Sequence, residues 1–100
     1  MVQWITSDEA AQLVPDRAKV ALGGAHRLAP VALVKALIRR SVKDLHLITT
    51  PTGGFGAELL IAGGAVRAVE TAQISLAELG LAPAFRRAAE EGRLKIFEST

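Results

Sequence analysis

The segment DRAKVALGGAHRLAP, residues 16–30, indicates the architecture of the whole chain. It predicts, in order, a short buried strand, a glycine pair, a polar loop and a helix start: Val20–Leu22, Gly23–Gly24, His26–Arg27 and Pro30. Proline suits the first helical position, where its missing N–H would have no intrahelical partner. A strand, glycines and then a helix bring backbone N–H groups close to a phosphate or an oxyanion. We therefore interpret this turn as the binding edge of the molecule.

Outward from this segment, strand and helix patterns alternate along the chain. Further strands are predicted over residues 45–49, 66–72 and 94–97. Helices are predicted over residues 6–14, 30–41, 55–62, 75–80 and from Pro83 to Gly92, the first with a Thr6/Glu9 capping box and with Leu13 and Val14 facing inward. Hairpin signals are missing, and the strand starts lie roughly 20 to 28 residues apart, as in βαβ crossovers. The predicted fold class is α/β: an open, mostly parallel sheet of about four strands with helices on both faces.

Composition limits the classes of protein that fit. One hundred residues form one small domain, spanning 1–100, which buries roughly 65% of its unfolded surface. The chain has no cysteine, no apolar run long enough for a bilayer and no signal-peptide pattern at its start, so we expect a cytoplasmic protein without membrane contact. The net charge of +2 comes from dispersed basic residues without interleaved aromatics, so nucleic acid is not an expected partner.

In a parallel sheet, ligands bind outside the carboxyl ends of the strands. Here those ends carry two glycine-rich loops, together with the hydroxyls of nearby threonines and the side chains of His26 and Arg27. The loops match neither the G-x-G-x-x-G dinucleotide fingerprint nor the P-loop. The connectors at the opposite edge indicate no function. The binding edge therefore suits an acyl thioester or a phosphate.

Catalytic groups are scarce at that edge. Glu70 and Glu98 are the only carboxylates near the strand ends, and each fits a surface or hydrogen-bonded role better than a nucleophilic one. His26 and His46 lack the spacing of a metal site, and His46 is expected to be packed or hydrogen-bonded within its strand. We assign no catalytic residue, no metal ligand and no permanently bound cofactor.

Four parts of the sequence resemble one known family. Residues 20–34, with Gly-Gly, Arg27 and Pro30, are similar to the start of the α subunit of family I coenzyme A transferases, the glutaconate CoA-transferase type above all. The resemblance continues through residues 44–48, the glycine loop Thr52-Gly53-Gly54 and residues 57–67. It covers about residues 6 to 99.

The resemblance implies a truncated, CoA-transferase-like partial domain from an enzyme that moves coenzyme A between carboxylic acids. A coenzyme A thioester would then be its substrate. The implied binding residues are Gly23, Gly24, Ala25, His26 and Arg27 of the first loop and Thr52, Gly53 and Gly54 of the second. The family's catalytic glutamate belongs to the β subunit. The chain alone would therefore be inactive and would need a β subunit or the remainder of the α subunit.

Two other interpretations stay open at this point. The chain is a stand-alone, non-catalytic module that binds an anion or a CoA thioester, or it is a fragment without function. A truncated open sheet also leaves an unpaired strand and an uncovered face, which predicts a homo- or hetero-oligomer.

Overall fold

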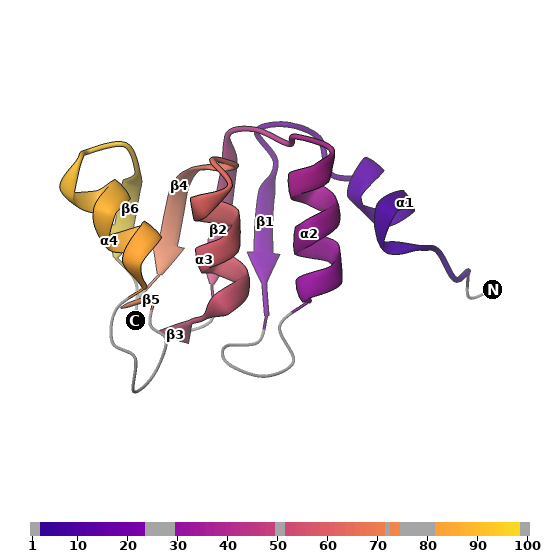
Figure 1. Ribbon diagram of the computed structural model, residues 1–100, viewed down its shortest axis with the longest axis horizontal. Helices are drawn as coiled ribbons and strands as arrows, with labels where there is room; N and C mark the ends of the chain where they lie inside the picture. Colours follow the sequence, from indigo (N-terminus) through magenta and orange to yellow (C-terminus); the bar gives the residue numbers. More distant parts are fainter. Residues whose placement is uncertain (1–2, 24–29, 50–51, 72, 75–81, 99–100) are drawn as a thin grey trace.

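The computed structural model describes residues 3–23, 30–49, 52–71, 73–74 and 82–98 (Figure 1). The side chains of Thr52 and Gln73 are not among the parts described. The described helices are α1 (Ser7–Gln12), α2 (Val31–Arg39), α3 (Phe55–Ala62) and α4 (Pro83–Glu90). The described strands are β1 (Lys19–Leu22), β2 (Leu45–Thr49), β3 (Thr52–Gly53), β4 (Val66–Thr71), β5 (Gln73–Ile74) and β6 (Lys95–Glu98). The helix predicted over residues 75–80 lies outside the described residues.

Four of the strands form one parallel sheet in the order β1-β2-β4-β6. All three pairings in this sheet are parallel, as the sequence pattern predicts. The register places Lys19, His46, Ala68 and Lys95 in one row across the sheet. The short strands β3 and β5 form a separate parallel pair. The α/β class is confirmed.

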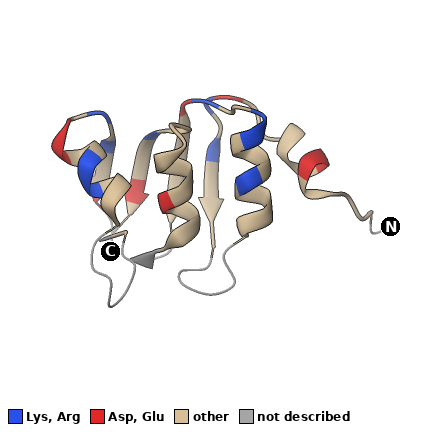
Figure 2. Cartoon of the chain, viewed as in Figure 1, with Lys and Arg blue, Asp and Glu red and all other residues tan. Residues whose placement is uncertain are grey.

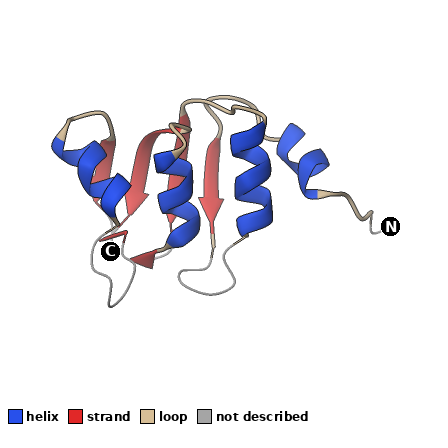
Figure 3. Ribbon diagram, viewed as in Figure 1, coloured by secondary structure: helices blue, strands red, loops and turns tan. Residues whose placement is uncertain are grey.

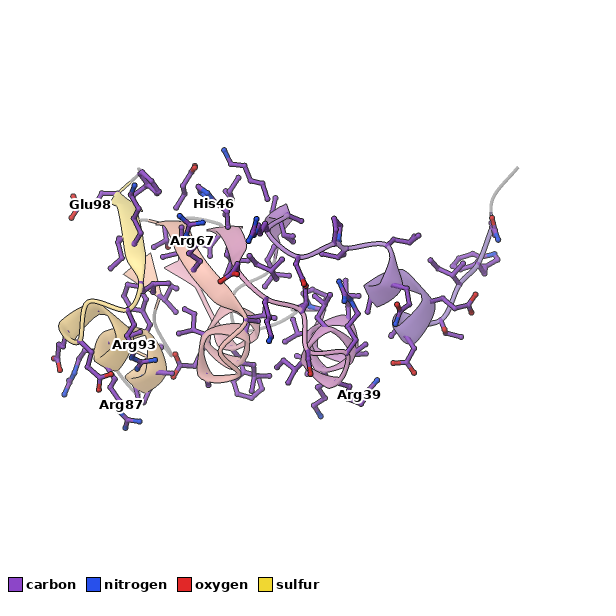
Figure 4. The ribbon with its side chains drawn as sticks, turned by 90° about the horizontal axis from the view of Figure 1, so that it is seen from above. Arg39, His46, Arg67, Arg87, Arg93 and Glu98 are labelled. Carbon is purple, nitrogen blue, oxygen red and sulfur yellow. The ribbon has the colours of Figure 1, made fainter. Side chains whose placement is uncertain are left out.

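The helices α2, α3 and α4 all lie on the same side of the sheet (Figures 3 and 4). The expectation of helices on both faces is therefore not met by the described part of the chain. The reason is the strand order, which advances in one direction through the sheet. Since parallel crossovers are almost always right-handed, every connecting helix in such an order falls on the same face. The predicted alternation of strands and helices along the chain holds, but the described helices α2, α3 and α4 cover one face of the sheet and not both.

The hydrophobic core lies between the sheet and these helices. Each strand turns alternate side chains toward the helices, because successive side chains point to opposite faces. On β2, Leu45 and Leu47 are buried while His46 and Ile48 are half-buried. Val34 and Leu37 of α2 and Leu60 of α3 meet the strand residues from the other side. Further buried members of the same cluster are Leu22, Ala57, Ile61, Val69 and Ala88.

The ends of the helices follow the sequence signals closely. Thr6 and Glu9 form the predicted capping box at α1, with Glu9 N–H donating to Thr6 Oγ1 over 3.1 Å. Gly63 caps α3, and Gly64 follows with a φ of +75°, a conformation that favours glycine. The expectation for Leu13 is wrong, because its side chain is 73% exposed. The buried residue of α1 is Ala11, and Leu13 lies about 200° around the helix from it, whereas Val14 packs against the core as expected.

A buried carboxylate joins α3 to α4. Glu58 accepts hydrogen bonds from the backbone N–H groups of Ala84 (2.6 Å) and Phe85 (2.9 Å) in the first turn of α4. The residue before α4, Ala82, has no side chain that accepts such a bond. Glu58 therefore supplies the N-cap from another helix, where its negative charge also favours the positive end of the helix dipole.

Candidate functional site

The carboxyl ends of the four main strands lie at the same edge of the sheet. The last residues of these strands are Leu22, Thr49, Thr71 and Glu98. The β3–β5 pair lies at the same edge, beyond the ends of β2 and β4 (Figure 1). This is the edge where the sequence predicts binding.

The second glycine loop is the better described half of this edge. Thr52 and Gly53 pair with Gln73 and Ile74 in the β3–β5 ribbon. Gly54 is the N-cap residue of α3, and its carbonyl accepts the N–H of Glu58 over 3.1 Å. The ribbon therefore fixes the path of the chain from the end of β2 into α3.

Two helix N-termini face this edge without a side-chain cap. Neither Pro30, before α2, nor Gly54, before α3, makes a side-chain hydrogen bond to its helix. The first N–H groups of a helix have no intrahelical partner and carry a partial positive charge. Backbone donors are thus available at the carboxyl edge for an anionic or carbonyl oxygen.

A pair of threonines holds the middle of the edge together. The Oγ1 atoms of Thr49 and Thr71 are 2.6 Å apart in a hydrogen bond between the ends of β2 and β4. Thr71 is buried. The sequence places both residues at the predicted binding edge, and the structure brings them into contact.

The predicted binding residues divide into two groups. Gly23, Thr52, Gly53 and Gly54 lie at the carboxyl edge, and Gly23 is exposed there with open space around the position of a Cβ. Residues 24–27, which include His26 and Arg27, lie outside the described residues. The role in binding of both groups of residues stays a prediction.

The face of the sheet opposite the helices carries a second polar cluster. We call this face the open face; along the strands it consists of Lys19, Ala21, His46, Ile48, Ala68, Glu70, Lys95 and Phe97. His46 Nε2 lies 2.8 Å from Glu70 Oε1, and Lys19 Nζ lies 3.4 Å from the same oxygen. The His46 ring stacks on Phe97 with ring centres 5.5 Å apart. The expectation that His46 is packed and hydrogen-bonded is confirmed.

Sequence and spacing explain how this cluster forms. His46 and Phe97 are on β2 and β6, with β4 between them, and the residue in the row of His46 on β4 is Ala68. A methyl side chain at that position leaves room for the two rings to meet. Partial desolvation raises the pKa of Glu70, but hydrogen bonds and charge from Lys19, and then from His46, outweigh it and lower the pKa below its ordinary value.

A shallow cavity of about 250 Å³ lies at the amino-terminal end of the open face. Its polar and aromatic lining comes from Arg17, Asp44, His46, Arg67, Lys95 and Phe97. Arg17 and Asp44 have φ values of 66° and 58°, in the left-handed region where non-glycine residues are uncommon. The sequence pattern indicates only connectors here, because the lining residues are distant in the chain and meet only once the strands align.

Within the described ranges, no group of three or more His, Asp or Glu side chains is placed to hold a metal ion. The helices described there are also all too short or too polar to cross a membrane.

Comparison with known proteins identifies the family. Residues 5–100 match the family described as coenzyme A transferase. Among solved structures, the chain is similar to a variant of the decarboxylase AibA/AibB, with a TM-score of 0.88 and 35% sequence identity. That match covers 98% of this chain and 38% of the other, so the chain spans well under half the length of its structural neighbour. No curated protein matches.

The match extends over nearly the whole chain, and the shared fold includes the four-stranded parallel sheet with its carboxyl edge. The chain belongs to the coenzyme A transferase family.

Proposed function

We propose that this chain acts as the N-terminal part of a CoA-transferase α subunit. Its two glycine loops help to form the site where coenzyme A is exchanged between carboxylic acids. The observation that carries the proposal is the family match over residues 5–100, combined with a carboxyl edge built from uncapped helix N-termini.

The proposed binding residues are those of the two loops. Gly23 to Arg27 would contact the thioester or its carboxylate partner from one side, and Thr52 to Gly54 from the other. The guanidinium of Arg27 would hold a carboxylate or phosphate as a planar fork. The thioester is a substrate and is not a resident cofactor.

The chain needs a partner in this proposal. The family resemblance assigns the nucleophilic glutamate to the β subunit, and we assign no nucleophile among the residues of this chain. The neighbour AibA/AibB, whose name gives two components, supports an assembly of more than one chain. We propose a hetero-oligomer with a β subunit, in the cytoplasm.

Decarboxylation is the second candidate function. The 35% identical neighbour is named a decarboxylase. The fold therefore also occurs in a protein that is not named a transferase. A decarboxylase also acts on a carboxylic acid or its derivative, so the same proposed binding residues would serve either reaction. The two functions differ in their products.

The test is reconstitution. The chain is mixed with the β subunit and the remaining part of the α subunit of a glutaconate-type CoA-transferase, supplied with acetyl-CoA and a panel of carboxylic acids, and the products are separated by chromatography. New acyl-CoA species that require both proteins support the transferase proposal. Release of carbon dioxide from an acyl-CoA supports the decarboxylase instead. Coenzyme A binding without any turnover supports the stand-alone binding module, and the absence of both contradicts all three.

Arg27→Ala tests the first loop. We expect coenzyme A binding, measured by calorimetric titration, to weaken by about 1.5–3 kcal/mol, the value of a hydrogen bond to a charged group. Arg87→Ala is the matched control, because Arg87 is exposed on α4 and is far from the carboxyl edge of β1. Unchanged affinity in the Arg27 variant would remove this side chain from the site.

A further inference from the structure

Glu58 is the only charged residue of α3, and it is buried beside α4. It accounts for the single acidic segment that Figure 2 shows on α3. Only 8% of the residue is exposed. A carboxylate removed from water is costly unless hydrogen bonds compensate it, and the N–H groups of Ala84 and Phe85 do so here. A polar residue in place of Ala82 would cap α4 locally, so what the bond from α3 adds is a tie between the two helices.

This tie closes a ring of hydrogen bonds around the second glycine loop. At the end of the loop, the carbonyl of Gly54 accepts the N–H of Glu58 over 3.1 Å. Within the loop, Gly53 pairs with Ile74 in the β3–β5 ribbon, and the carbonyl of Ile74 accepts the N–H of Ala82 over 3.3 Å. Ala82 is the residue before α4, whose first turn binds the carboxylate of Glu58. The ring therefore runs from the loop through β5 and α4 to Glu58 and back to the loop.

The parts of the ring outside the loop are shielded from water. Ile74 and Ala82 have no exposed surface, at 0% each. Hydrogen bonds are stronger where water is excluded. Among the hydrogen bonds between described residues, loss of the Glu58 carboxylate would leave α4 joined to the ribbon by the 3.3 Å bond from Ala82 and not joined to α3. Glu58 therefore completes the ring.

We propose that Glu58 is a positioning residue for the second glycine loop. By tying α4 to α3, it holds the backbone of the loop at the carboxyl edge in the conformation that binds the CoA thioester. This inference rests on the proposed function, which places the loop in the ligand site. Glu58 does not itself contact the ligand, because its two carboxylate oxygens bind the first turn of α4. The competing explanation is that Glu58 caps α4 and has no effect on the loop.

Glu58→Ala tests the tie in this chain through backbone amide exchange, read by NMR, and through coenzyme A affinity, read by calorimetric titration. We expect amides of the loop and of β5 to exchange about tenfold or more faster relative to those of β1 and β2, as in a local opening. Coenzyme A should bind about fivefold or more weakly, because the loop spends less time in its binding conformation. Glu58→Gln keeps one acceptor oxygen and should lie between the parent and Glu58→Ala in both measurements.

A double variant separates positioning from capping. In Glu58→Ala/Ala82→Ser, a hydroxyl group lies at the N-cap of α4, where the extended backbone (φ −61°, ψ 126°) suits a capping side chain. This hydroxyl can accept an N–H from the first turn of α4, but it makes no link to α3. We expect the urea midpoint to recover much of what Glu58→Ala loses. Loop exchange and coenzyme A affinity should stay as in Glu58→Ala.

Val42→Ala is the control for a general loss of stability. Val42 is buried and lies between α2 and β2, at the edge of the sheet opposite the loop. The substitution should lower the urea midpoint, and it should leave loop exchange and coenzyme A affinity within about twofold of the parent.

Three results would overturn the proposal. Loop amides could exchange in Glu58→Ala as they do in the parent, or a folded Glu58→Ala chain could keep the parent's affinity for coenzyme A. Alternatively, Glu58→Ala/Ala82→Ser could restore loop protection together with the urea midpoint, in which case Glu58 only caps α4. Failure of the proposed function has a different sign: the parent itself does not bind coenzyme A, while the exchange comparison still decides whether Glu58 holds the loop.

Discussion

The two faces of the sheet differ in the interactions that their side chains make. On the helix side, Leu45, Leu47 and Val69 are fully buried in an apolar core. On the open side, the same strands present Lys19, His46 and Glu70 in a solvated network of charges. Neighbouring residues of a strand point to opposite faces. A residue in the apolar core is therefore followed directly in the sequence by a residue on the open face. Apolar packing and charged interactions are therefore separated across the thickness of a single sheet.

The largest expected effect tests the two faces at successive residues of β2. Leu47→Ala should lower the free energy of unfolding by about 3–4 kcal/mol, since it removes a fully buried side chain and leaves a cavity. Ile48→Ala, on the open face, should cost about 1 kcal/mol, because its side chain is only partly removed from water. Urea unfolding at neutral pH measures both. Equal losses would mean that the open face is packed as tightly as the helix side.

The next effect concerns the charge buried on the helix side. Glu58→Ala leaves the N–H groups of Ala84 and Phe85 without their acceptor and should cost about 2–3 kcal/mol. The control is Glu90→Ala, which removes an exposed carboxylate paired with Arg86 at 3.5 Å and should cost about 0.5 kcal/mol or less. If the two variants unfold at the same urea concentration, the cap from Glu58 does not stabilise α4.

The smallest effect is the pH response of the open face. The pKa of Glu70 is lowered in the folded state, so its carboxylate stabilises the fold above the unfolded value of about 4.3 and that contribution disappears as the pH falls through the folded pKa. The parent chain should therefore be more stable than Glu70→Gln at pH 7, and the gap between them should narrow at about pH 3.

Urea midpoints at the two pH values measure this gap. Glu98→Gln is the matched control, because Glu98 is exposed on β6 and has no ion pair among the residues that the structure describes. A gap that stays constant with pH would show that Lys19 and His46 do not favour the charged form of Glu70.

The local structure was largely predictable from sequence. The Thr6 and Glu9 pair marks the start of α1, and Gly63 with Gly64 marks the end of α3, because each signal satisfies backbone groups within a few residues. The exposure of Leu13 follows from its position about 200° around the helix from the buried Ala11, and the capping signals do not report it. The face on which each helix lies was equally hidden, because it depends on strand order and not on any single segment.

Prediction of the site was less complete, for the same reason. The carboxyl edge and its two loops were predictable. The alternation of strands and helices in the sequence indicates parallel strands, and the carboxyl ends of parallel strands lie at the same edge of the sheet. The contact of Glu58 with α4 joins positions 26 and 27 residues apart, and no local pattern reports it. A signal did exist: Glu58 is the only charged residue of α3, and α4 begins after Ala82 with no acceptor of its own. The open-face cluster has no such signal, because it requires the register of four strands.

The strand order β1-β2-β4-β6 also has a consequence for how the chain is made. Each strand of the main sheet pairs with the strand before it in that order, so every pairing closes one helix-containing crossover and no pairing waits for a distant segment. During synthesis from the N-terminus, the partner of β2, which is β1, has therefore already been made when β2 leaves the ribosome. The same holds for β4, which pairs with β2, and for β6, which pairs with β4. The order is therefore compatible with assembly in the direction of translation, in which each new strand adds to the one that was made before it.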